Sequence, residues 1–228
     1  MISFVTMELL YCDDQILAIN KPAGALTIPD GYDKTLPNLK QLLDIEYGNV
    51  WTVHRLDKET SGVVLFALSA AAHKILSIQF EKREIKKTYL ALVHGTPQKE
   101  MFVIDEPLKV NGDRSHRTVP DHVNGKKALT NVKIITRFES YTLIEASPET
   151  GYTHQIRSHL FFAGFPIVND TLYCTNNRKI VSGSVPDRLM LHAKSISFWH
   201  PVLCESLTIE APTPIAFTLV IDKIRQES

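Results

Sequence analysis

A polar stretch of ten residues that runs straight into an apolar one constrains the fold of this chain most. Residues 53–62 read VHRLDKETSG, and six of the ten side chains are those of His, Arg, Asp, Lys, Glu and Thr. Such a stretch cannot lie in a core. Residues 63–68 are all apolar, include β-branched and aromatic types, and predict a buried strand. A polar loop that leads into a buried strand can hold a reactive side chain on a rigid base.

Asp57 is the candidate catalytic residue of this loop. It lies two residues after Arg55 and three before Thr60, where the Thr-Ser-Gly sequence can turn the chain into the strand. The residues alone leave two interpretations open. Asp57 can be a turn carboxylate that accepts hydrogen bonds from backbone N–H groups, which is the commoner use of such an aspartate. It can also be a nucleophile.

Composition places the chain among ordinary globular proteins. It has 228 residues, 44% hydrophobic and 22% charged, enough for one large domain or two lobes. Its 25 basic and 25 acidic residues give a net charge of zero. This balance excludes a uniformly basic nucleic-acid-binding protein, but it allows a locally basic cleft.

Cysteine usage and hydropathy predict a cytoplasmic protein. Cys12, Cys174 and Cys204 are odd in number, far apart and without Cys-x-x-Cys spacing, which predicts free thiols in a reducing compartment. The first ten residues have no basic start and contain Glu8, so we expect no signal peptide. No apolar run approaches the ~20 residues of a membrane-spanning helix, so we expect no membrane contact.

Hydrophobic periodicity predicts both strands and helices along the rest of the chain. Strands are expected near residues 9–11, 16–19, 88–94, 131–138, 141–147 and 188–199. Helices are expected over residues 35–47 with Pro37 in the first turn, over 69–84 capped by Ser69, and from an N-cap at Thr153 to a stop at Gly164. Residues 101–127 are polar and predict a long functional loop, with a solvated β-hairpin as the alternative.

The motifs of the chain, taken in order, resemble those of the RluA-type pseudouridine synthases, a family of RNA uridine isomerases. Residues 54–62 match the family's H-R-L-D-x-x-T-S-G signature, whose aspartate attacks the uridine. Further segments resemble the family's elements at residues 20–24 (NKPAG), 87–91 (KTYLA), 125–130 (GKKALT), 150–159 (TGYTHQIRSH), 166–170 (PIVND) and 188–193 (RLMLHA). The resemblance covers nearly all of the chain.

The resemblance implies catalytic roles for three residues. Asp57 is then the nucleophile. Tyr89 stacks near the target base and its hydroxyl is a candidate for handling the C5 proton, although a tyrosine on a strand is more often a core residue. Arg157 pairs with Asp57 and stabilises its negative charge. These two residues are far apart in the sequence, so their pairing is a claim about tertiary structure.

Five more residues are expected to bind substrate. Arg55 is implied as a wedge or phosphate contact beside the flipped nucleotide, and Leu191 as a side chain packed beside the target base, with core packing as its alternative. His54 and Thr60 belong to the same signature. Lys21 is either a phosphate contact or a solvated turn lysine. His154 and His159 are five residues apart, which does not align them on one helix face, so we expect no metal site there.

Two positions depart from the family pattern. Tyr152 stands where the family has its first arginine, which removes a cationic contact with RNA and bears on the choice of substrate. Asn169 stands where the family has glycine in the P-I-x-G-D turn. Asparagine tolerates a positive φ best after glycine, so we expect this exchange to be mild.

The fold and function follow as expectations from the resemblance. Residues 1–228 should form one α+β catalytic domain, a mixed and largely antiparallel sheet with flanking helices and two lobes around a central cleft, without a separate N-terminal RNA-binding domain. The implied activity is isomerisation of specific uridines in structured RNA, tRNA or rRNA, by a monomer that needs no metal or other cofactor. The alternatives are an RNA-binding protein of this fold without catalysis and, less favoured, a glycosidase. A glycosidase needs a second acid, for which only the off-pattern Glu59 is at hand.

Overall fold

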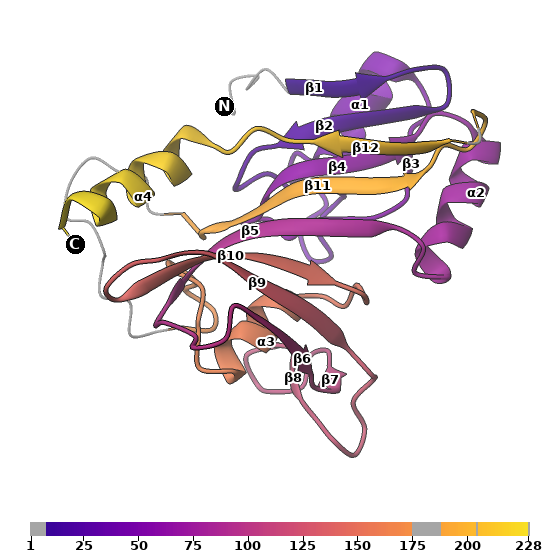
Figure 1. Ribbon diagram of the computed structural model, residues 1–228. Helices are drawn as coiled ribbons and strands as arrows, with labels where there is room; N and C mark the ends of the chain where they lie inside the picture. The colour runs from indigo at the N-terminus through magenta and orange to yellow at the C-terminus, as the bar shows by residue number, and fades with distance from the viewer. Residues whose placement is uncertain (1–7, 175–187, 204, 228) are drawn as a thin grey trace. The chain divides into compact units, whose positions relative to one another are not determined.

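The computed structural model describes residues 8–174, 188–203 and 205–227 (Figure 1). Internal contacts divide the chain into two compact units. The first unit contains residues 1–87 and 193–212, and the second contains residues 88–192 and 213–228. Residues 1–7 and Cys204, which enter the targeting and cysteine predictions, lie outside the described residues. None of the described helices is long and apolar enough to cross a membrane.

The first unit is a sheet with two helices (Figure 1). Its strands follow the order β1-β2-β4-β11, while β3 pairs with β4 and β12 pairs with β11. The elements are β1 (Glu8–Cys12), β2 (Ile16–Lys21), α1 (Leu39–Tyr47), β3 (Trp51–Thr52), β4 (Ser61–Ala67), α2 (Ala70–Glu81), β11 (Leu191–Trp199), of which residues 193–199 belong to this unit, and β12 (Ser206–Glu210).

Strand β4 is the predicted buried strand, and all of its residues are buried. It pairs antiparallel with β2 in a register that places Lys21 opposite Gly62 and Ile19 opposite Val64. Gly62 has a φ of 113°, and a Cβ atom there would lie 2.1 Å from the carbonyl oxygen of Ala193. Only glycine fits this close approach of two backbones. The end of the polar stretch is therefore fixed by strand packing.

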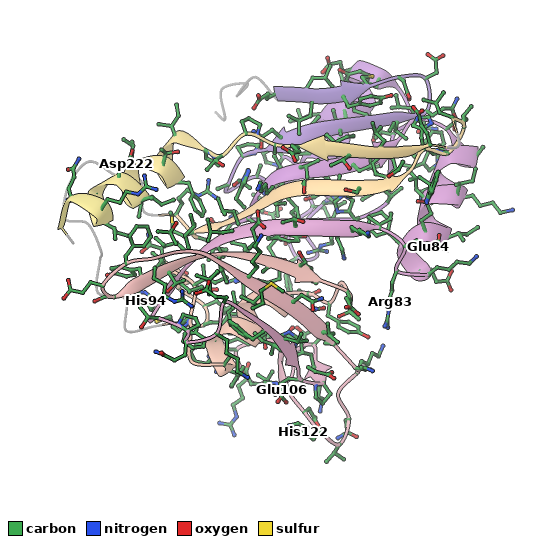
Figure 2. All side chains as sticks on the ribbon, in the orientation of Figure 1. Arg83, Glu84, His94, Glu106, His122 and Asp222 are labelled. Carbon is green, nitrogen blue, oxygen red and sulfur yellow. The ribbon has the colours of Figure 1, made fainter. Side chains whose placement is uncertain are left out.

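Both helices of the first unit are shorter than predicted. Helix α1 begins at Leu39, because the side chain of Asn38 caps it by accepting a hydrogen bond from the Gln41 N–H, and Pro37 precedes the cap instead of occupying the first turn. Ser69 caps α2 as predicted. Helix α2 ends at Glu81 because Arg83 has a φ of 60° and the Glu84 N–H donates to the Gln79 carbonyl, a left-handed C-terminal cap (Figure 2).

The second unit combines the strand order β5-β10-β9-β6 with a two-stranded hairpin and two helices (Figure 1). Its elements are β5 (Lys86–His94, in this unit from Thr88), β6 (Met101–Asp105), β7 (Leu108–Lys109), β8 (Val119–Pro120), β9 (Leu129–Arg137), β10 (Tyr141–Pro148), α3 (Gln155–Phe162) and α4 (Ile215–Glu227). Its core contains fully buried Leu92 and Ile144 from the sheet, Leu160 from α3 and Phe217 from α4. Strand pairs β5–β10, β10–β9 and β9–β6 are antiparallel.

Residues 101–127 are more regular than the predicted loop. They contain β6, which pairs with β9, and the β7–β8 hairpin, which is the alternative that the sequence left open. The hairpin is not simply solvated, since Leu108 and Thr118 are buried. Near its base His122 lies 3.1 Å from the carboxylate of Glu106 (Figure 2). The hairpin could not be predicted from the hydrophobic pattern, because its strands pair over only two residues each in a polar segment.

Two other element boundaries differ from prediction. Helix α3 begins at Gln155 after His154, which has a φ of 55°, so Thr153 is not the N-cap. Strand β11 begins at Leu191 instead of residue 188. Met190, just before it, is bonded through its backbone to Leu92 and Val168 of the second unit. The α+β class, the mixed and mostly antiparallel pairing and the flanking helices are as predicted, while the cleft stays a prediction.

Candidate active site

Asp57 lies in the first unit, in a loop of residues 53–60 between β3 and β4 that we call the signature loop. Asp57 is half-buried, whereas Arg55, Lys58 and Glu59 are exposed. The Thr60 N–H donates to the Asp57 carbonyl at 3.1 Å, which closes a turn just before the strand. The turn therefore fixes the backbone of Asp57, next to charged residues that are exposed.

Thr27 fixes the residue immediately before Asp57. Its buried hydroxyl donates to the Leu56 carbonyl at 3.1 Å and accepts from the Leu56 N–H at 3.3 Å. One hydroxyl therefore satisfies both backbone groups of Leu56, whose side chain is also buried. Thr27 was not among the predicted site residues, because nothing in its neighbourhood distinguishes it from an ordinary strand or turn threonine.

Lys21 fixes the residue immediately after Asp57. Its side chain is fully buried, and the ammonium group donates to the carbonyls of Ala25 at 2.6 Å, Lys58 at 2.8 Å and Pro22 at 3.0 Å. The two sequence-based interpretations, a phosphate contact and a solvated turn lysine, both require an accessible ammonium group. Because the ammonium group is buried, both interpretations are wrong. A buried ammonium group is tolerated only when hydrogen-bond acceptors, here the three carbonyls, replace its water. Lys21 joins the turn of residues 20–25 to the signature loop.

His54 connects the start of the signature loop to β4. Its Nε2 atom accepts a hydrogen bond from the Leu65 N–H at 2.9 Å, and its ring stacks on Phe80 with centroids 5.1 Å apart. Burial lowers the pKa of His54 to about 3, and the nearby charge of Lys87 adds to this effect. The ring is therefore neutral near pH 7. Burial also lowers the pKa of Lys87 to about 8. A contact between His54 and substrate stays a prediction.

Thr60 and Arg55 occupy contrasting positions in the same loop. The Thr60 hydroxyl is buried and has no hydrogen-bond partner among the residues that the structure describes. Arg55 is exposed, which a wedge or a phosphate contact requires. Their roles in substrate binding stay predictions.

Arg157 lies in the second unit, on helix α3, and is almost fully buried. Its Nε and Nη2 atoms donate to the two carboxylate oxygens of Asp170, each at 2.7 Å. This two-bond geometry fixes the plane of the guanidinium group. Asp170 was not among the predicted site residues, although its place in the PIVND match was a usable signal. The pairing of Arg157 with Asp57 stays a prediction, because the two residues belong to different units.

The turn that carries Asp170 needs a left-handed residue at position 169, where asparagine replaces the family's glycine. Asn169 has a φ of 60°, as expected from its match to a glycine position. Asp170 also accepts hydrogen bonds from the N–H groups of Leu172 and Tyr173, both at 3.1 Å. One carboxylate therefore holds the arginine and orders the following turn.

Gln155 and His159 of the HQIRSH segment hold α3 in place. Gln155 donates to the Leu129 carbonyl at 3.0 Å and accepts from the Tyr152 N–H at 3.2 Å. The buried ring of His159 lies between the Thr130 hydroxyl at 2.9 Å and the Glu106 carbonyl at 3.0 Å. Both ring nitrogens of His159 therefore have hydrogen-bond partners within the protein. In the described part of the chain, no group of three or more His, Cys, Asp or Glu could hold a metal ion.

Tyr89 and Leu191, the other two predicted site residues of the second unit, contact its core. Tyr89 is half-buried on β5, opposite Ala146 of β10, and packs against the core. Leu191 is a buried core member, so the core-packing interpretation is confirmed. The contact of either side chain with a target base stays a prediction.

The largely antiparallel sheet and the signature loop, whose backbone is fixed on both sides of Asp57, indicate a class of protein, the pseudouridine synthases. The chain belongs to the RNA pseudouridylate synthase family, which matches residues 15–161. The resemblance noted from the sequence is thereby confirmed, and the protein is an isomerase that acts on RNA.

Curated relatives and solved structures agree with this assignment. The chain is 37% identical over 220 residues to tRNA pseudouridine synthase C of Haemophilus ducreyi, covering 90% of each protein. It is 36% identical over 211 residues to the dual-specificity RNA pseudouridine synthase RluA of Pasteurella multocida, covering 90% of this chain and 93% of that protein. Human RNA pseudouridylate synthase domain containing 1 has a TM-score of 0.79 at 25% identity, covering 99% of this chain and 95% of the other. Human RNA pseudouridylate synthase domain containing 4 has a TM-score of 0.77 at the same identity, covering 96% and 93%.

Proposed function

We propose that this enzyme converts specific uridines of structured RNA, tRNA or rRNA, into pseudouridine, with Asp57 as the nucleophile. The observation that carries this proposal is the bracing of the signature loop on both sides of Asp57, by Thr27 at Leu56 and by Lys21 at Lys58. A nucleophile benefits from a fixed position because orientation lowers the cost of reaching the transition state. A mere turn carboxylate would not need two buried side chains from another segment to hold its neighbours.

The RNA class follows from the relatives. One is named as a tRNA enzyme and another as a dual-specificity RNA enzyme. Uridines in loops are the preferred targets, since an unstacked base is easier to flip out of its strand. Tyr152, in place of an arginine, is the position most directly linked to a change in the RNA that is chosen.

The reaction breaks the N1–C1′ bond of uridine, turns the uracil and forms a C5–C1′ bond. The C5 proton is lost and N1 gains one, so no atoms are added or removed overall. A covalent bond from Asp57 would divide this exchange into two easier steps. Attack at C1′ or C6, or removal of the C2′ proton, would each start from the same carboxylate.

The remaining site residues have supporting roles in this proposal. Arg157, oriented by Asp170, pairs with Asp57 and stabilises its charge. The Tyr89 ring stacks near the target uracil and its hydroxyl handles the C5 proton, while Leu191 packs beside the base. Arg55 is exposed and fills the space left by the flipped nucleotide or contacts its phosphate. His54 and Thr60 shape the same loop.

We also propose that the enzyme works as a monomer in the reducing cytoplasm. Cys12 and Cys174 are free thiols in the structure, which suits that compartment. Light scattering on the purified protein together with fractionation of cells tests both statements. A stable dimer, or recovery of the protein outside the cytoplasm, would contradict them.

Mapping of pseudouridines in cells tests the function and the site together. Total tRNA and rRNA from cells that lack this protein should miss one or more pseudouridines, and the wild-type protein should restore them. Asp57→Asn should not restore them, whereas Glu59→Gln, which removes an exposed carboxylate two residues away, should. Unchanged maps in the deleted cells, or rescue by Asp57→Asn, would contradict the proposal.

A further inference from the structure

Tyr173 is a buried tyrosine of the second unit that none of the roles above uses. Its hydroxyl donates to the Thr118 carbonyl at 3.0 Å and accepts from the Thr118 N–H at 2.9 Å. Burial raises the pKa of Tyr173 to about 12, so the hydroxyl keeps its proton and can donate near pH 7. One side chain therefore satisfies both backbone groups of a buried residue next to the β7–β8 hairpin.

The ring of Tyr173 lies beside two cations. The guanidinium carbon of Arg157 is 5.3 Å from the ring centroid, and that of Arg117 is 5.8 Å from it. Both distances fall within the range of cation–π attraction. Each arginine also has its own carboxylate, Asp170 for Arg157 and Asp113 for Arg117. Tyr173 thus touches the arginine of the predicted active site and an arginine of the hairpin segment.

The β7–β8 hairpin depends on contacts outside itself. Its ladder contains only two residue pairs, which are too few to hold a hairpin in place. The loop between its strands is internally ordered, since Asp113 accepts from the N–H groups of Ser115 and Arg117. Thr118 then connects this loop outward, through Tyr173 and through its hydroxyl, which donates to the Thr153 carbonyl just before α3 at 2.7 Å.

We propose that Tyr173 is a positioning residue that couples the β7–β8 hairpin to Arg157. The hairpin exposes Lys109 and Arg114, which can contact RNA phosphates, so bound RNA and Arg157 would share one anchor. The inference rests on the proposed function in taking Arg157 as part of the active site. The hydroxyl of Tyr173 positions the hairpin, and its ring positions the guanidinium group. The two halves of the side chain therefore affect different kinetic constants.

Two substitutions separate these halves. Tyr173→Phe keeps the ring beside both arginines and removes both hydrogen bonds to Thr118. We expect KM for RNA to rise roughly tenfold while kcat stays within about twofold. Tyr173→Leu also removes the ring, and we expect kcat to fall by roughly a further tenfold. The matched control is Tyr11→Phe, which removes a hydroxyl bonded to Asp13 at 3.0 Å in the first unit and should leave both constants within about twofold.

Limited trypsin digestion of the whole protein gives a second measurement that does not depend on Tyr173→Leu folding. Cleavage after Arg114 or Arg117 should be faster in Tyr173→Phe than in wild type and in Tyr11→Phe. An unchanged KM, a fall in kcat alone or unchanged cleavage in Tyr173→Phe would overturn the inference. These outcomes are distinct from failure of the proposed function, which would appear as full activity of Asp57→Asn whatever Tyr173→Phe does.

Discussion

The ammonium group of Lys21 lies 2.8 Å from the carbonyl oxygen of Lys58, the residue that follows Asp57. The two lysines are 37 positions apart in the sequence. The same carbonyl accepts a hydrogen bond from the Gly24 N–H at 2.8 Å. A buried charge, with no access to water, thus holds the turn after β2 against the loop that carries Asp57.

Replacing Lys21 with methionine should destabilise the protein. Methionine is close in length to lysine but cannot donate, so three backbone carbonyls lose a charged partner that is itself buried. We expect the free energy of unfolding to fall by about 3 kcal/mol in urea denaturation. Lys34→Met, at an exposed lysine of the same unit, should change it by less than about 0.5 kcal/mol. Equal losses in the two variants would show that the contacts of Lys21 contribute little.

Replacing Thr27 with valine should reduce catalysis as well as stability. The change keeps the shape but leaves the N–H and carbonyl of Leu56, next to Asp57, without their shared partner. We expect kcat to fall about tenfold and the free energy of unfolding to fall by about 1–3 kcal/mol. The control is Thr52→Val, which removes a buried hydroxyl that has no partner among the described residues and should be nearly neutral. A wild-type kcat in Thr27→Val would contradict the prediction, because it would show that catalysis does not depend on the hydrogen bonds between Thr27 and Leu56.

The neutral ring of His54 should make stability depend on pH. Its pKa is about 3 in the folded protein against an ordinary value of 6.5, so the unfolded state binds the proton more readily. The stability that comes from the neutral ring is present above pH 6.5 and is lost as pH falls from 6.5 toward 3. In this range the wild type should lose up to about 1.4 kcal/mol per pH unit more than His54→Gln, measured by urea denaturation. Parallel pH profiles of the two proteins would contradict the role of the ring.

Local sequence signals predicted the elements around the site well. Six consecutive apolar residues after a glycine predicted β4, and Ser69 marked the start of α2, because strand burial and helix capping depend on neighbouring residues. The helix ends were less predictable. The left-handed conformations at Arg83 and His154, which set boundaries of α2 and α3, occur at residues other than glycine, the residue type that usually marks them in a sequence.

The residues that hold the site were not predictable from local pattern. In the sequence, Lys21 has the neighbours of a surface lysine. It is a buried hydrogen-bond donor because the 20–29 segment packs against the signature loop. Asp170 and Tyr173 reach their partners Arg157 and Thr118 across 13 and 55 positions, respectively. Contacts over such distances depend on how the sheet and helices pack, which periodicity does not report.

Release of tritium from RNA that carries [5-³H]uridine tests most directly the claim that Asp57 carries out the reaction. Single-turnover assays with excess enzyme remove effects of weak binding, and circular dichroism checks that each variant is folded. Wild type and Glu59→Gln should release tritium at similar rates, whereas Asp57→Asn should release none above background while still binding the RNA. Release by Asp57→Asn at a rate near that of wild type, or a wild-type protein that binds RNA without releasing tritium, would contradict the account.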